Sequence, residues 1–331
     1  MLDVSQPEIA FALRVVRTGG HLAQRVQSGM ALQGLTKSDF SPVTVADFAV
    51  QAVVAHALEE AFPEDRLVGE ENADPLRSEE GAKTREVVAH YVKQAYEDAD
   101  EEKVCAWIDH GCGEAAGRFW TLDPIDGTKG YLRGGQYATA FALIEDGVVQ
   151  LGVLGCPNLG DQCQPELLGL GALLVAKRGA GAWYTTLSEE EDEFHPLHVS
   201  DCADPVQARI LRSVESGHTN AGQIDEIAKV LGVEAEPVLM DSQAKYATLA
   251  AGGGEILLRL LSPKKPDYKE KIWDQAAGSI ILEEAGGRIT DLNGAPLDFS
   301  QGRTLANNTG VFASNGPLHD AVLKAIARVC R

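Results

Sequence analysis

The first part of the chain combines two long helical repeats with several strand-like runs. Residues 7–30 and 42–62 carry apolar side chains three and four positions apart, the spacing that lines one face of a helix. Later apolar runs are shorter, and one pair flanks the turn residues Glu145-Asp146-Gly147, which predicts a hairpin. In chain order we expect a strand, a charge-rich surface excursion and two hairpins at 66–69, 73–103, 138–154 and 172–185. This part is therefore predicted to pack helices against a mostly antiparallel sheet.

The pattern changes near residue 205, where strands and helices begin to alternate. Strands are expected at 208–213, 237–240, 255–260, 288–291 and 310–314. Helices are expected at 221–231, 244–251 and 273–285, with a last one from about residue 318. Such alternation is typical of α/β architecture. We therefore predict two domains, an α+β domain at 1–204 and an α/β domain at 205–331.

Length and charge narrow the class of protein. The chain has 331 residues, of which 44% are hydrophobic, enough for one large domain or two ordinary ones. Its 49 acidic and 29 basic residues give a net charge of −20, which repels nucleic-acid backbones and anionic membranes. We therefore expect no nucleic-acid or membrane partner. An anionic substrate would need bound cations or a local basic pocket to reverse this field.

The six cysteines and the amino terminus predict the compartment. No two cysteines form a C-x-x-C pair, so neither a zinc knuckle nor a redox dithiol is indicated, and free thiols fit a reducing compartment. The first residues lack the basic and apolar regions of a signal peptide, and no apolar run approaches the ~18 residues of a membrane span. A cytoplasmic protein is therefore expected.

The most informative local pattern is Thr-Leu-Asp-Pro-Ile-Asp-Gly-Thr at 121–128. Asp123 and Asp126 flank a proline and precede a glycine, so a sharp bend is expected there. The apolar run before them predicts a buried strand, and open α/β sheets place their ligands at the carboxyl ends of strands. Converging carboxylates suit hard divalent cations, although an ordinary surface turn is the alternative. The Gly127-Thr128 step is expected to open a short helix whose free amides face an anion.

Three other acids stand where they could join this pair. Asp47 falls on the apolar face of the second expected helix, Glu70 follows a short strand, and Asp274 starts an apolar helix. Each has a purely structural alternative: a capping box with Thr44, an exposed pair with Glu71, or a helix N-cap. Taken together, the acids could supply ligands for two or three magnesium ions, which prefer a few carboxylates plus water and phosphate.

Several motifs along the chain carry a family resemblance. Asp-Pro-Ile-Asp-Gly-Thr at 123–128 and Trp-Asp-x-Ala-Ala-Gly at 273–278 resemble the two signatures of the lithium-sensitive, magnesium-dependent phosphatases, which include inositol monophosphatase and fructose-1,6-bisphosphatase. Ser-Pro-Val-Thr-Val-Ala-Asp at 41–47, Val-Gly-Glu-Glu-Asn at 68–72 and Asp-Ser-Gln-Ala-Lys-Tyr at 241–246 make the 3′(2′),5′-bisphosphate nucleotidases the closer resemblance. This resemblance spans nearly the whole chain. It implies a layered α-β-α-β-α fold, in which an α+β part is followed by an α/β part.

The resemblance implies roles for individual residues. The magnesium ligands would be Glu70, Asp123, Asp126, Asp274 and the carbonyl of Ile125. The pair that orients and deprotonates the attacking water would be Asp47 and Thr128. The substrate contacts would be Thr128, His218, Ser242, Lys245, Arg259 and Asp274. Most metal ligands would thus lie in 1–204 and the nucleotide contacts in 205–331, where Lys245 and Arg259 would form a cationic pocket for a second phosphate.

The implied reaction is hydrolysis of adenosine 3′,5′-bisphosphate to AMP and phosphate by direct attack of water. The resemblance also implies 3′-phosphoadenylyl sulfate as a second substrate, a link to sulfur assimilation and inhibition by lithium, and a monomer is expected. An inositol phosphate phosphatase is the nearer alternative, and a non-catalytic, metal-dependent binding protein is the more distant one. The segment 241–246 together with Arg259 favours a nucleotide substrate over an inositol phosphate.

Overall fold

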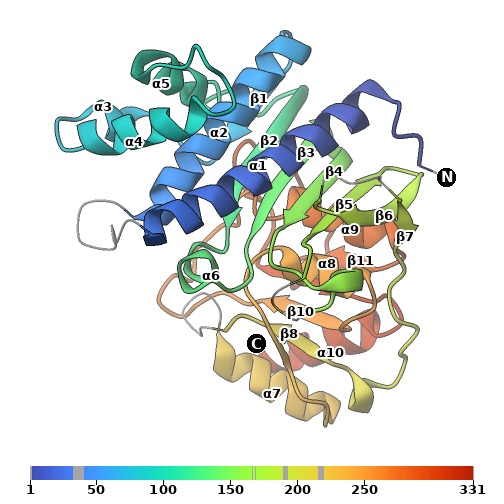
Figure 1. Ribbon diagram of the computed structural model, residues 1–331. Helices are drawn as coiled ribbons and strands as arrows, with labels where there is room; N and C mark the ends of the chain where they lie inside the picture. The colour runs from blue at the N-terminus through green and yellow to red at the C-terminus, as the bar shows by residue number, and fades with distance from the viewer. Residues whose placement is uncertain are drawn as a thin grey trace.

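The computed structural model of the protein describes residues 2–32, 41–165, 167, 169–188, 193–214 and 220–330. Within these residues, two β-sheets are stacked among three layers of helices (Figure 1). Three clusters of buried apolar side chains fill the spaces between the layers. The layered α-β-α-β-α fold expected from the sequence is therefore confirmed.

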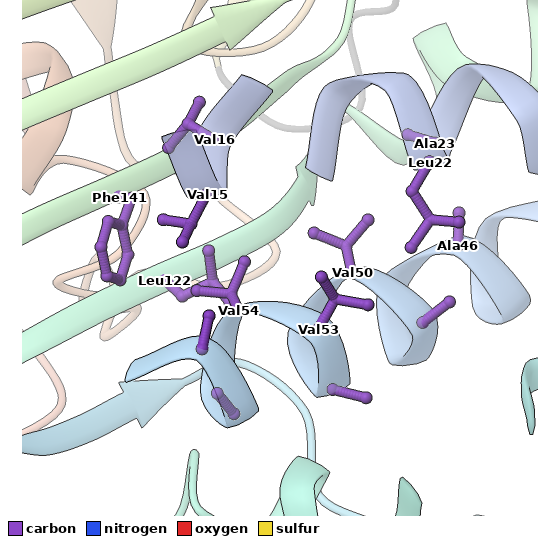
Figure 2. Close-up of a cluster of buried hydrophobic side chains, with 14 of the residues drawn as sticks. Val15, Val16, Leu22, Ala23, Ala46, Val50, Val53, Val54, Leu122 and Phe141 are labelled. Atoms are coloured by element: carbon purple, nitrogen blue, oxygen red, sulfur yellow. The ribbon is translucent and has the colours of Figure 1, made fainter. Parts of the chain in front are cut away.

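Two long helices form the first layer. Helix α1 spans Pro7–Leu32 and helix α2 spans Pro42–Ala61, and both pack against the first sheet. Pro42 stands at the start of α2, where its fixed φ suits a helix and its missing N–H costs nothing. Figure 2 shows apolar side chains at this interface: Val15, Val16, Leu22, Val50, Val53, Val54, Leu122 and Phe141. Asp47 lies on the same face of α2 as Val50 and Val54, and this face is turned toward the first sheet.

The first sheet has seven strands in chain order. They are β1 (Arg66–Gly69), β2 (Arg118–Asp126), β3 (Ala138–Glu145), β4 (Val148–Cys156), β5 (Ala172–Lys177), β6 (Gly181–Thr186) and β7 (His195–Pro196). Neighbours are antiparallel except β1 and β2, which run parallel. A parallel pair needs a long crossover. The charge-rich excursion supplies it through three helices, α3 (Asp74–Arg77), α4 (Ala82–Val92) and α5 (Glu101–Asp109).

A middle layer of two short helices separates the sheets. Helices α8 (Ala244–Ala250) and α9 (Ala276–Glu284) are buried nearly all round, as expected of helices covered on both sides. The second sheet has the order β11-β12-β10-β8-β9. Its strands are β8 (Ile210–Arg212), β9 (Val238–Leu239), β10 (Ile256–Arg259), β11 (Arg288–Thr290) and β12 (Val311–Ser314).

The last layer covers the outer face of the second sheet. It consists of α7 (Ala221–Leu231) and α10 (His319–Val329), which pack on each other beside β8 and β10 (Figure 1). Two 3₁₀ turns, η1 (Asp161–Cys163) and η2 (Pro205–Gln207), complete the described elements. Among the described helices, none is both long and apolar enough to cross a membrane.

The two sheets share a core. Strands of the first sheet end at Pro196 and those of the second begin at Ile210. One apolar cluster nevertheless joins both sheets through α8 and α9 and contains Leu174 of β5 and Leu257 of β10. The division into domains at 1–204 and 205–331 thus stays a prediction, because no separate core distinguishes the two parts on this face.

Candidate active site

The end of β2 carries two of the expected ligands on a β-bulge. Asp123 pairs with Ala140 and Asp126 with Ala138, so β2 contains one residue more than β3 over this stretch. Residues three apart in a regular strand face opposite sides, but the extra residue lets both aspartates face the same side. Pro124 tolerates the break, and its carbonyl accepts a hydrogen bond from Thr139 at 2.9 Å. The sharp bend expected from the sequence is therefore wrong, because the segment is a bulged strand.

The next residues open a short helix, as expected. Helix α6 spans Thr128–Arg133 after Gly127, whose φ of 89° lies in the left-handed region. Glycine is also required by space, since a Cβ at this position would lie 2.7 Å from Cβ of Ser242. Thr128 is exposed at the first turn. The close approach brings the β2 end directly against the segment that precedes α8.

Asp47 lies inside α2 and is not a capping residue. The helix begins at Pro42 with Ser41 as its N-cap, so Asp47 falls beyond the first turn. The alternative of a capping box with Thr44 is therefore wrong. Asp47 is buried, and this burial, together with the charges of Glu71 and Glu70, raises the pKa of its carboxyl well above the usual value.

The loop after β1 is fixed by backbone contacts and by a buried glutamine. Glu70 donates its N–H to the Leu122 carbonyl at 3.2 Å, which ties the loop to β2. Gln51 of α2 accepts from the Glu71 N–H at 3.0 Å and donates to its carbonyl at 2.7 Å. Side chains at Gly69 or Gly111 would clash with this amide. Gln51 stands one helical turn after Asp47, so α2 holds the acid and the loop together.

Asp274 precedes α9 without capping it. The N-cap of α9 is Gln275, which makes no side-chain capping bond. The N-cap alternative for Asp274 is therefore wrong. Its carboxylate instead faces Arg259, with 3.7 Å between Nη2 and Oδ2. Burial raises the pKa of Asp274 well above its usual value against the opposing effect of Arg259, and Asp126, Glu270 and Glu70 add to the rise.

We call Asp47, Glu70, Asp123, Asp126 and Asp274 the acid cluster. Removal from water raises the pKa of each carboxyl, and nearby acids add to the rise for each of them except Asp126. Glu70 is exposed to solvent, yet its carboxyl lies close enough to Asp126 to be repelled by it. Burial and Glu70 also raise the pKa of Glu71 to about 7. The structure therefore brings these acids together and concentrates negative charge at the ends of β1 and β2.

The cluster has the chemistry of a cation site. Asp123 is 2% exposed, and its Oδ1 has no hydrogen-bond partner among the described residues. A buried carboxylate oxygen without a partner costs free energy that a bound cation would recover. In the described ranges, no three His, Cys, Asp or Glu side chains are already spaced around one point as ligands of a metal ion. The carboxylate oxygens of the acid cluster thus lie close enough to repel one another, but they do not surround a common point as the ligands of a metal ion would.

Two cations border the acid cluster on its α8 and β10 side. Lys245 is 5% exposed, and burial lowers the pKa of its ammonium group to about 8, with Asp126 acting in the opposite direction. Arg259 lies 2.6 Å from Glu270, and Glu270 and Asp274 raise the pKa of its guanidinium although burial lowers it. Ser242 stands beside them in the left-handed conformation, with φ 65°. Positive and negative groups therefore lie close together at this site.

Not every expected residue can be placed. Ile125 is buried in the bulge between the two aspartates, where its carbonyl belongs to the same strand end. His218 lies outside the described residues. Sequence reasoning also missed three polar residues that fix the site: Gln51, Gln243 and Arg303. The signal available for Gln51 was a polar residue on the apolar face of α2, one turn from Asp47.

Comparisons with known proteins identify the family of the chain. The family model described as the inositol monophosphatase family matches residues 5–329. A Schizosaccharomyces pombe protein named 3′(2′),5′-bisphosphate nucleotidase is 43% identical over 340 residues, covering 97% of this chain and 95% of its own length. An Oryza sativa protein of the same name is 41% identical over 338 residues, with 96% and 93% covered.

Solved structures agree in fold. Inositol monophosphatase from Anabaena (Nostoc) superposes with a TM-score of 0.65 at 20% identity, covering 98% of this chain and 96% of that one. The enzyme from Thermotoga maritima gives 0.64 at 22% identity, with 98% of both chains covered. The structural similarity extends over the whole arrangement of layers, and the family match covers nearly the full length. The resemblance seen in the motifs is confirmed, and the chain belongs to the inositol monophosphatase family.

Proposed function

We propose that the protein is a magnesium-dependent phosphomonoester hydrolase that removes the 3′(2′)-phosphate of adenosine 3′,5′-bisphosphate to give AMP and phosphate. The observation that carries this proposal is the close approach of Lys245 and Arg259 to the acid cluster. Acids alone would repel a bisphosphate, and cations alone would leave the buried carboxylates uncompensated. Relatives at about 40% identity that are named 3′(2′),5′-bisphosphate nucleotidases support the nucleotide as substrate.

We infer that the cluster binds two or three magnesium ions, and the unpartnered Oδ1 of Asp123 is the strongest single reason. The carboxylates of Glu70, Asp123, Asp126 and Asp274 and the carbonyl of Ile125 would hold them. Bound magnesium would supply positive charge to the phosphate oxygens and lower the pKa of a nearby water. The inhibition by lithium expected from the family resemblance belongs to the same proposal.

Asp47 and Thr128 would handle the proton of the attacking water. Helix α2 packs against α6, which brings the elements that carry these two residues together. The Thr128 hydroxyl would orient the water, and Asp47 would accept the proton through that hydroxyl. Burial and the charges of Glu71 and Glu70 raise the pKa of Asp47, and a raised pKa makes a carboxylate a stronger base.

Lys245, Arg259 and Ser242 would bind the nucleotide, together with Thr128, Asp274 and His218. An arginine fork matches a phosphate with two parallel donors, and a buried ammonium keeps its charge more easily when an anion arrives. The sulfated nucleotide 3′-phosphoadenylyl sulfate carries the same 3′-phosphate and would be a second substrate, which would link the enzyme to sulfur assimilation. A cytoplasmic location is proposed on the basis of the six free cysteines, and a monomer is proposed as well.

A substrate panel tests the assignment. Phosphate release is measured with adenosine 3′,5′-bisphosphate, adenosine 3′-monophosphate, 3′-phosphoadenylyl sulfate and inositol 1-phosphate, with magnesium, without it, and with added lithium. We expect the bisphosphate to be preferred over the 3′-monophosphate, because only the bisphosphate presents a second phosphate to the cations. A decisive preference for inositol 1-phosphate would defeat the nucleotide assignment, and magnesium-independent turnover would defeat the metal site.

Two variants sharpen the panel. Lys245→Met should reduce the preference for bisphosphate over 3′-monophosphate by roughly 10- to 100-fold, the value of one hydrogen bond to a charged group. Arg288→Met is the matched control, because Arg288 is an exposed cation that pairs with Asp320 at 2.8 Å on the far side of the second sheet. A preference that survives Lys245→Met would remove Lys245 from the phosphate pocket.

A further inference from the structure

The end of β2 and the segment before α8, which both carry residues of the candidate active site, meet at one tight contact. Gly127 packs against Ser242, where no Cβ fits, and a side chain at Gly130 would strike the Gln136 carbonyl. Arg133 of α6 forms an ion pair with Asp241, the residue before Ser242. The strand end that carries Asp126 is therefore seated on the segment that leads into α8. Residues 126–133 and 241–243 form this contact, which we call the junction.

Gln243 connects the junction to the turn that carries Asp274. Its backbone N–H donates to Oδ2 of Asp126 at 2.6 Å. Its side-chain Nε2 donates to the Trp273 carbonyl at 3.0 Å, and its Oε1 accepts from the Gly278 N–H at 3.1 Å. Gln243 is 2% exposed. One buried residue thus contacts two segments that each carry an acid of the cluster.

A side-chain amide is well suited to this position. It must donate to a carbonyl and accept from an N–H at the same time, which an ionised carboxylate or an apolar side chain cannot do. The contacts continue away from the junction, since Tyr246 donates to Gln275 at 2.6 Å and Gln275 donates to Glu270 at 2.9 Å. Glu270 in turn pairs with Arg259. The backbone carbonyl of Gln243 accepts from the Tyr246 N–H at 2.8 Å, so Gln243 borders this buried polar network, and such networks fix geometry more strictly than apolar packing does.

We propose that Gln243 is a positioning residue that sets the distance between Asp126 and Asp274 so that their carboxylates can share one cation. This inference rests on the magnesium site of the proposed function. Residues that orient the ligands of a metal typically change its affinity by ~10- to 100-fold when they are replaced. Replacing the amide should therefore weaken magnesium binding in that range and leave the first sheet and its core unchanged.

The test compares three variants of the full-length chain. Gln243→Met keeps the volume and the backbone donor but removes the hydrogen bonds of the side-chain amide. Gln243→Asn keeps an amide that is one methylene too short to reach both partners, and it serves if the methionine variant does not fold. Asn315→Leu is the matched control, because Asn315 is a buried amide that donates to the carbonyls of Ser200 at 3.1 Å and Cys202 at 2.8 Å.

Magnesium binding is measured by calorimetry without substrate, and thermal stability, kcat and KM are measured across a magnesium titration. We expect Gln243→Met to raise the magnesium dissociation constant by about 10- to 100-fold, with activity partly recovered at high magnesium. Asn315→Leu should lower the melting temperature and leave the dissociation constant unchanged. Gln243→Asn should fall between wild type and Gln243→Met.

Two results would contradict the account, and they are distinguishable. If the wild-type protein binds magnesium and Gln243→Met binds it equally well, Gln243 has a structural role only and the positioning proposal is overturned. If the wild-type protein itself binds no magnesium, the metal site of the proposed function is overturned, and the positioning proposal with it. Loss of stability in Gln243→Met and Asn315→Leu, with unchanged magnesium affinity in both, also counts against positioning.

Discussion

Two buried acids of this protein are treated in opposite ways. Glu255, 1% exposed, accepts hydrogen bonds from Ser200 at 2.9 Å and from the Arg209 backbone at 2.6 Å, and pairs with the Arg209 guanidinium at 2.7 Å. Asp123, 2% exposed, has other acids as neighbours and an oxygen without a partner among the described residues. Burial is nearly the same at the two positions, but only Glu255 is compensated by the protein itself.

The difference indicates what each acid is for. A buried carboxylate whose hydrogen bonds are all made within the chain fixes structure, here the segment at Ser200 and the start of β8. A buried carboxylate that is surrounded by like charge is held at a cost, which a cation can recover on binding. The protein therefore gives up stability at the acid cluster and keeps it at Glu255.

The largest expected effect is on activity at Asp123. Asp123→Asn removes a ligand and one buried charge while it keeps the shape. We expect turnover to fall by at least ~100-fold, because even residues that only orient metal ligands cost 10- to 100-fold. Without metal, the melting temperature should rise, because repulsion from Glu70 and Asp126 is relieved. Normal turnover in this variant, measured at saturating substrate and magnesium, would exclude Asp123 from the site.

The next largest effect is expected at Glu255, where a substitution should lower stability and leave turnover unchanged. Glu255→Gln should lower the free energy of unfolding by about 2–3 kcal/mol, as one hydrogen bond to a charged group is lost and the exposed Arg209 remains solvated. Turnover should be unchanged at temperatures where the variant is folded. Asp320→Asn is the control, because this exposed partner of Arg288 should contribute less than ~0.5 kcal/mol. An unfolding curve identical to wild type for Glu255→Gln would refute the structural role.

The smallest effect is a pH dependence at Glu71. Burial and Glu70 raise the pKa of this group from 4.5 to about 7, so the folded protein retains its proton longer than the unfolded chain does. Its contribution to stability is therefore full below pH 4.5 and is lost as the pH rises through 7. Without metal, the difference in melting temperature between Glu71→Gln and wild type should grow in favour of the variant as the pH rises from 4.5 to 7. Above pH 7 the difference should stay constant. A difference that shrinks with rising pH would show that the sign is wrong.

Elements whose signal is local were predictable from the sequence. Helix α7 and strand β1 begin and end where the apolar pattern placed them, at 221–231 and 66–69. Strand β9 is shorter than the predicted 237–240, because it pairs with β8 alone at the edge of the second sheet. Periodicity reports the burial of a segment, whereas the length of an edge strand depends on its neighbour.

The gathering of the acids was predictable from the sequence, but their geometry was not. The motifs indicated which acids gather, and the structure brings Asp47, Glu70, Asp123, Asp126 and Asp274 together. The bulge at 123–126 could not be predicted, because it is defined by the register of β2 against β3. Gln243 was hidden for a similar reason, since its partners at 273 and 278 are distant along the chain. Pairing between remote segments leaves little trace in the local pattern.

The most direct test is a crystal structure grown with manganese in place of magnesium, with anomalous scattering used to locate the ions. Manganese accepts the same oxygen ligands and scatters anomalously. The account predicts anomalous peaks within coordination distance of Oδ1 of Asp123 and between Asp126 and Asp274. An active protein whose manganese ions lie elsewhere, with the acid cluster free of them, would contradict it.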